Sequence, residues 1–155
     1  MKKITFNVYK LNLSRLLDWK ATIPENEHPR YYPTEVYDIV PVEGWLLSNK
    51  DIEKIGCFYD TELLEKIDAK FVAHHAFRSF DGDMSDWWTV SEYSTSASML
   101  PHAYKSRTEA IFKLGQVLTN HYFEIEPAIQ EYRERRNVIN GECLERKETH
   151  NAPNN

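Results

Sequence analysis

The chain has 155 residues, of which 41% are hydrophobic and 13% aromatic, and its formal net charge is −5. This length suits one domain with its own core and is short for two, and the apolar content excludes a chain that is disordered throughout. A mildly acidic charge without a basic half argues against duplex DNA as the main partner, and no apolar run has the length of a membrane-spanning helix.

The two cysteines, Cys57 and Cys143, lie far apart in the sequence and in dissimilar contexts. We expect both to be free thiols of a reduced, cytoplasmic protein, because the N-terminal residues lack the apolar run of an export signal. Two cysteines also exclude a zinc site that is built from cysteine alone.

The first part of the chain predicts one strand, one short helix and a long loop. Apolar and polar residues alternate from Ile4 to Val8, which is the pattern of a half-buried strand. Leucines within residues 13–19 indicate a short helical turn. Four prolines then interrupt residues 21–44, so we expect a loop there with one short extended piece around residues 36–40.

A β-hairpin is predicted in the middle of the chain, after two short helices. Ser48 and Asp51 form the capping pattern of the first helix, which Gly56 is expected to end, and Asp60 or Thr61 caps the second helix. The hairpin follows. Its strands are residues 71–80 and 87–94, and its loop is the glycine-containing, acidic stretch of residues 81–86.

Two longer helices are predicted near the C-terminus. Ser106 and Glu109 cap an amphipathic helix over residues 107–121, and Pro127 is expected to begin another that runs to about Asn140. Together these elements predict an α+β domain over residues 1–141, with a small antiparallel sheet packed against two C-terminal helices. Residues 142–155 are polar and are expected to form a disordered tail.

The hairpin loop carries the best candidates for chemistry. Asp81, Asp83 and Asp86 could bind a divalent metal, with His74 or His75 as a general base, in a small metal-dependent hydrolase. The loop lacks the glycine that a calcium-binding loop needs at its sharp turn, and the two adjacent histidines point to opposite faces of a strand. We therefore keep this hydrolase as the alternative function.

The same region also predicts a protein-binding surface. Neighbouring residues of a strand face opposite sides of a sheet, so one of the two adjacent tryptophans is exposed unless a second layer covers both; burial of both in the core is the competing interpretation. No lysine or arginine lies between Arg78 and Lys105. An acidic, aromatic surface favours a protein partner with a basic face over nucleic acid, and a homodimer is the simpler alternative. The predicted contact residues are Trp87, Trp88, Asp81, Asp83, Asp86, Glu92 and Tyr93.

The order of an aromatic strand from Trp87 to Glu92, a turn rich in serine and threonine, and a capped helix from Arg107 resembles that of plasmid antirestriction proteins. The resemblance covers about a quarter of the chain and implies a small accessory protein of a phage or plasmid. The sequence contains no phosphate-binding glycine loop and no familiar catalytic motif. We therefore expect a non-catalytic intracellular binding protein without a cofactor, such as an inhibitor of a host nucleic-acid-binding defence protein.

Overall fold

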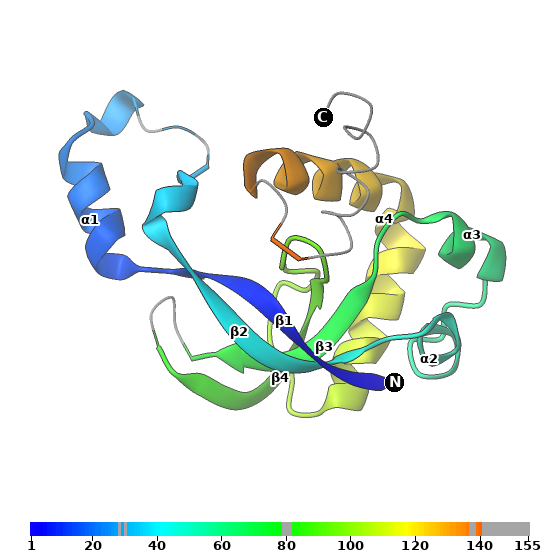
Figure 1. Ribbon diagram of the computed structural model, residues 1–155. Coiled ribbons are helices and arrows are strands. Elements are labelled where there is room, and N and C mark those ends of the chain that lie inside the picture. Colours follow the sequence, from blue (N-terminus) through cyan, green and yellow to red (C-terminus); the bar gives the residue numbers. More distant parts are fainter. Residues whose placement is uncertain (28, 30, 79–81, 137–138, 141–155) are drawn as a thin grey trace, which may run out of the picture.

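The computed structural model describes residues 1–27, 29, 31–78, 82–136 and 139–140, and the predicted tail over residues 142–155 lies outside this range. The strands are β1 (Lys2–Leu11), β2 (Tyr37–Leu46), β3 (Phe71–Phe77) and β4 (Met84–Glu92). The helices are α1 (Leu13–Ala21), α2 (Asn49–Lys54), α3 (Thr61–Lys66) and α4 (Arg107–Arg136), with 3₁₀ helices η1 (Glu25–Glu27) and η2 (Thr34–Val36). The strands form one antiparallel sheet in the order β1-β2-β3-β4, so the predicted α+β class is confirmed (Figure 1).

Side-chain caps begin the helices where the sequence predicts them. The Ser48 hydroxyl accepts the Asp51 amide N–H at 3.2 Å, and the Asp51 carboxylate accepts the Ser48 amide N–H at 2.9 Å, which completes a capping box. At the start of α4 the Ser106 hydroxyl accepts the Glu109 amide N–H at 3.1 Å. These contacts are local, so the sequence alone predicts them correctly.

Strand β2 is longer than the sequence predicts, and the expectation of a loop through residue 44 is wrong. Pro41 pairs with Asn7 of β1, but the Asn7 amide N–H points away from β2 and donates to the Asn140 side chain at 2.9 Å. The Pro41 nitrogen therefore faces the opposite side of β2, where pairing with β3 covers only Gly44 to Leu46. Because neither neighbouring strand needs a donor from Pro41, the proline costs the sheet no hydrogen bond.

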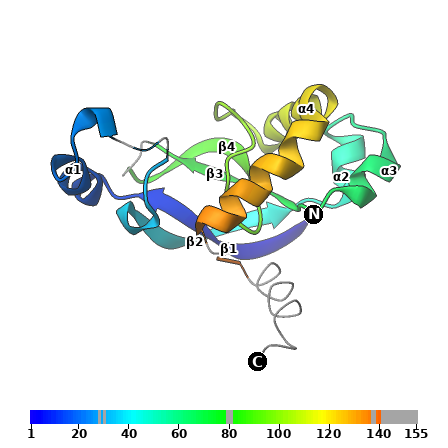
Figure 2. The ribbon, with the colours of Figure 1, turned by 90° about the horizontal axis from the view of Figure 1, so that it is seen from above.

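The sheet buries side chains on both faces. One core lies toward the helices and joins Phe71 and Val90 of the sheet to Ile111 and Leu114 of α4. Figures 1 and 2 show α4 across the sheet, with α1 at one end of the molecule and α2 and α3 at the other. The residues of the second core, on the other face, are Phe6, Val8, Val42 and Val72.

The sheet is strongly curled around this second core. The rings of Phe6 on β1 and His74 on β3 lie 5.2 Å apart between centroids, although β2 separates the two strands in the sheet order. Two strand spacings in a flat sheet would separate such residues by about 9 Å. The β1–β2 hairpin therefore folds back over β3 and encloses the core.

Helix α4 differs from the two helices that the sequence predicts. Its first part covers the sheet as expected, but the break falls at His121 (φ −136°, ψ 22°), and Pro127 lies inside the second part instead of at its start. At this break the Glu124 carboxylate lies 3.0 Å from Nδ1 of the His121 ring. The described part of the helix runs to Arg136, and Ile139 and Asn140, near the predicted end, are not helical.

A pair of glycines allows α2 and α4 to approach each other closely. A Cβ atom on Gly115 would lie 1.6 Å from the carbonyl oxygen of Gly56, so neither backbone leaves room for a side chain there. The sequence predicts that Gly56 adopts the left-handed conformation at the end of α2, but Cys57 does so instead, with φ 55°. Cys57 is an exposed free thiol, and Cys143 lies outside the described residues.

Candidate functional site

The predicted contact residues lie along β4, whose pairing with β3 changes near the end of the hairpin. His75 pairs with Trp88, but the next aligned pair is Phe77 with Met84, so β4 accommodates extra residues in a bulge. The Ser85 hydroxyl holds the bulge together, because it donates to the Ala76 carbonyl oxygen at 2.6 Å and accepts the Trp87 amide N–H at 3.2 Å.

The two tryptophans have different surroundings, as one of the two sequence interpretations requires. Trp88 packs against the helix-side core, and its ring lies 4.1 Å from the His75 ring between centroids. Trp87 belongs to neither core and is 46% exposed. Trp88 is therefore a packing residue, whereas Trp87 can contact another molecule.

Two arginines lie near the tryptophans, although the sequence between Arg78 and Lys105 contains no lysine or arginine. The Arg107 guanidinium at the start of α4 lies 4.7 Å from the Trp45 ring centre and 5.8 Å from that of Trp88. Beside Trp87 there is a cavity of about 340 Å³, which is lined by Phe77, Arg78, Ser85, Asp86, Trp87 and Ala103. Folding thus places one arginine against each tryptophan region, so this surface carries both signs of charge.

The exposed part of the predicted site is its outer end. Asp83 and Asp86 are exposed, as is Arg78 on the facing strand, and Met84 is 39% exposed. Asp81 lies outside the described residues. Sequence reasoning missed Met84, which pairs with Phe77 after the register shift, and Arg78, which lines the cavity with Trp87, because a register shift has no signature in the sequence.

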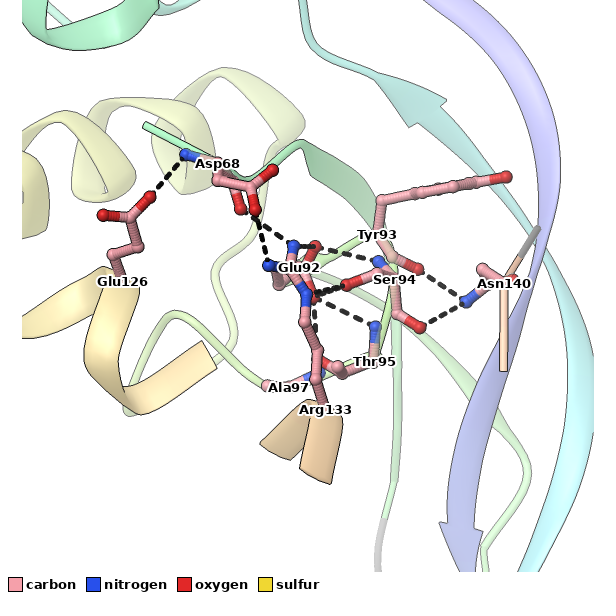
Figure 3. A network of polar contacts seen from close by, with 9 residues as sticks. All are labelled: Asp68, Glu92, Tyr93, Ser94, Thr95, Ala97, Glu126, Arg133 and Asn140. Atoms are coloured by element: carbon pink, nitrogen blue, oxygen red, sulfur yellow. Dashed lines mark hydrogen bonds and ion pairs between the residues drawn. The ribbon is translucent and has the colours of Figure 1, made fainter. Parts of the chain in front are cut away.

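Glu92 was expected on the binding surface, but it is 1% exposed, and this expectation is wrong. Its carboxylate accepts the amide N–H groups of Ser94 and Thr95 at 2.8 and 3.0 Å, together with both of their hydroxyls (Figure 3). Arg133 of α4 lies 3.8 Å from the same carboxylate. Glu92 therefore organises the turn after β4 from inside the protein.

Arg133 joins this turn to the segment before β3. Its guanidinium donates to the Ser94 hydroxyl at 3.1 Å, to the Asp68 carboxylate at 3.1 Å and to the Asp68 carbonyl at 2.8 Å. Arg133 is 8% exposed, and Figure 3 shows it between Asp68 and the turn. This network of Asp68, Glu92, Ser94 and Arg133, the buried ion network, fastens the second part of α4 to the sheet.

Tyr93 is partly buried, so only part of its side chain is available at the predicted contact surface. It packs against the second core, and its ring stacks on that of Phe6 with centroids 6.5 Å apart. Strand alternation places Tyr93 on the face opposite Glu92, and the curled sheet covers that face as well. Sequence periodicity gives the direction of such a side chain but does not reveal a second layer.

The two histidines lie on opposite faces of β3, as predicted. His74 is 4% exposed; its Nδ1 donates to the His75 carbonyl at 2.8 Å, and its Nε2 accepts the Ser91 hydroxyl at 2.8 Å. Burial lowers the pKa of His74 to about 4. Because both ring nitrogens are engaged inside the second core, His74 cannot act as the base of the alternative hydrolase.

The described part of the hairpin does not assemble a ligand set. Among the described residues, no three histidine, cysteine or carboxylate side chains gather closely enough to hold a metal ion. Nδ1 of the His75 ring, which packs on the Trp88 ring, is buried and has no hydrogen-bond partner among the described residues. The described part of this region thus offers an exposed aromatic side chain, Trp87, and no cluster that could hold a metal ion.

Comparison with protein-family models, with curated proteins and with solved structures found no match to this chain. The resemblance to plasmid antirestriction proteins therefore rests on the order of sequence features alone. Within the described residues, no helix has both the length and the apolar composition that a bilayer crossing requires.

Proposed function

We propose that this is a non-catalytic binding protein that contacts another protein through the outer end of the β3–β4 hairpin. This hairpin face consists of Arg78, Asp83, Met84, Asp86 and Trp87. The observation that carries the proposal is the exposure of two large apolar side chains of β4, Trp87 at 46% and Met84 at 39%. Large exposed apolar side chains within a charged border are typical of the residues that dominate protein interfaces.

Charge indicates the kind of partner. Asp83 and Asp86 outnumber Arg78 on the hairpin face, so a partner surface with basic residues would complement it. Nucleic acid itself fits poorly, because two carboxylates would face its phosphates. Proteins that bind nucleic acid present basic surfaces, and inhibition of such a host protein by a phage- or plasmid-encoded factor is the biological role that we propose.

The proposal is tested by affinity capture from a host lysate with wild type, Trp87→Ala and Asp86→Lys. We expect wild type to retain a basic protein that both variants lose, and we expect high salt to weaken the retention. Tyr59→Ala is the matched control, because Tyr59 is an aromatic residue that is 69% exposed at a different site, after α2. Equal retention by Trp87→Ala and wild type would refute the hairpin face as the contact.

Self-association is the competing explanation for an exposed tryptophan. Light scattering of wild type and Trp87→Ala distinguishes self-association from the binding of a different protein. A wild-type dimer that Trp87→Ala converts to a monomer would assign the hairpin face to a homodimer instead of a different partner. A wild-type monomer leaves the face free for the proposed partner.

A further inference from the structure

A second cavity lies at the end of the molecule that α2 and α3 form. Its volume is about 250 Å³, and its lining comes from the end of β2, the start of α2, α3 with the segment that follows it, and the first residue of β3. Figure 1 shows these elements together at one end of the molecule. We call this space the α2–α3 cavity, and it shares no lining residue with the cavity beside Trp87.

The inner wall of the α2–α3 cavity is apolar. Its side chains belong to the helix-side core and are each at most 9% exposed, and they are Leu47, Ile52, Leu64, Ile67 and Phe71. Voids larger than a water molecule are few in protein interiors, and an engineered apolar cavity of about 150 Å³ binds benzene. A space of about 250 Å³ therefore accommodates a hydrocarbon group of about six to ten carbon atoms.

The walls of the cavity are held apart by contacts that lie outside it. Helix α2 is fixed to α4 by the close approach of Gly56 and Gly115. Helix α3 is fixed to α4 by the Tyr122 hydroxyl, which donates to the Leu63 carbonyl oxygen at 2.8 Å. Because each helix is attached to α4, neither can move into the cavity without breaking its own contact. The space is therefore preformed, as ligand sites commonly are.

The mouth of the cavity is polar and carries a positive charge. Ser48, Asn49 and Lys70 are exposed there, and Lys70 is the ionisable side chain among the described residues of the lining. The carboxylate of Asp51, next to Ser48 in the capping box, is already paired with the N-terminal ammonium group at 3.1 Å. The ammonium group of Lys70 and the amide group of Asn49 are both hydrogen-bond donors, so the mouth suits an anionic acceptor.

We propose that the α2–α3 cavity binds a medium-chain carboxylate. The hydrocarbon chain lies against Ile52, Leu64 and Phe71, where its removal from water supplies most of the affinity. The carboxylate remains at the mouth, where Lys70 and Asn49 donate hydrogen bonds to it. This binding site is separate from the hairpin face, so the inference does not depend on the proposed function.

An NMR titration with three eight-carbon molecules tests both parts of the site. Octanoate, octan-1-ol and octylammonium share a chain and differ in the charge of the head group, and acetate has the head group without the chain. We expect octanoate to shift the methyl signals of Ile52, Leu64 and Ile67 saturably, and to raise the melting temperature by mass action. Octan-1-ol should bind more weakly, octylammonium most weakly, and acetate should leave these signals unchanged. No saturable shift with octanoate, or equal affinity for octanoate and octylammonium, would overturn the inference.

Two variants locate the bound molecule. Lys70→Gln removes the charge at the mouth, and we expect it to weaken octanoate binding by about twofold to fivefold while octan-1-ol binding stays the same. Lys66→Gln is the matched control, because Lys66 is an exposed lysine of α3 that pairs with Glu62.

Ala69→Leu places a larger side chain in the lining of the cavity, and we expect it to abolish the binding of both octanoate and octan-1-ol. The NMR spectrum of the free variant shows whether it is folded. Unchanged octanoate affinity in Lys70→Gln or in folded Ala69→Leu would contradict the proposed site, and Lys70→Gln alone decides the matter should Ala69→Leu fail to fold.

Discussion

At the scale of single residues, His74 connects burial to a dependence on pH. Its pKa falls from 6.5 to about 4 because the second core removes the ring from water. Between these two values the unfolded chain binds a proton that the folded protein excludes, so the stability of the fold falls as the pH falls through this window. Above pH 6.5 the His74 ring is neutral in both the folded and the unfolded state, and below about pH 4 the loss of stability is complete.

We predict that the free energy of unfolding decreases by about 3 kcal/mol between pH 7 and pH 4 on account of His74, from the conversion of about 1.4 kcal/mol per pKa unit. Urea unfolding of wild type and His74→Gln at several pH values measures this. The difference between the two proteins isolates His74, because both contain the same carboxyl groups and these contribute equally to each pH profile. The same pH dependence in both would show that His74 is not the group responsible.

At the scale of elements, two of the contacts of α4 outside its hydrophobic packing depend on residues that are distant in the sequence. The first is the close approach of Gly115 to Gly56. Gly115→Ala would force a methyl group into the Gly56 carbonyl, and we expect it to destabilise the protein by about 3 kcal/mol. Thermal or urea unfolding measures the change, and Gln116→Ala, at the exposed neighbouring position, is the control. A loss at Gly115 as small as that at Gln116 would mean that α2 and α4 can separate without cost.

The second contact is the buried ion network. Arg133→Met keeps much of the side-chain volume but removes the donors to Ser94 and Asp68, and it leaves Glu92 buried without its cation. We expect a loss of about 3 kcal/mol, at the lower end of the range for broken buried pairs because Asp68 remains partly exposed. Urea unfolding tests this, with exposed Glu134→Ala as the control. Hydrogen exchange should then show that the second part of α4 opens before the sheet; simultaneous opening would assign the network a different role.

At the scale of the whole molecule, the sequence predicts interactions between residues that are close along the chain better than interactions between distant residues. The caps at Ser48 and Ser106 involve residues three positions apart, and the sequence predicts both. The strand assignment failed at Pro41, because the cost of a proline depends on which neighbouring strand its nitrogen faces. Periodicity placed Trp87 and Trp88 on opposite faces, but only the fold shows that Trp88 is packed.

The candidate site was predicted less completely than the fold for the same reason. Glu92 appears as a surface acid in the sequence, and the arginine beside it, Arg133 of α4, lies 39 positions after Ser94. A sequence shows which charged residues are adjacent along the chain. Whether a charged residue is buried depends instead on the residues that lie next to it in the fold. Asp83 and Asp86 keep the exposed positions that their local sequence suggests, whereas the sequence did not distinguish which of the two tryptophans is exposed.

The bond between Asn7 and Asn140 spans 133 positions of the chain, and this sets an order for synthesis on the ribosome. At elongation rates of about 5–20 residues per second, Asn7 emerges roughly 7–27 s before Asn140, although Ser96, which accepts the Tyr9 amide N–H, emerges earlier. During that interval the nascent chain presents an open strand edge, which is a template for pairing with other chains. Lys2 and Lys3 at the start of β1 place positive charge beside this edge, as natural strands do where they must avoid a premature partner. Translation speed thereby becomes part of how this sequence reaches its fold.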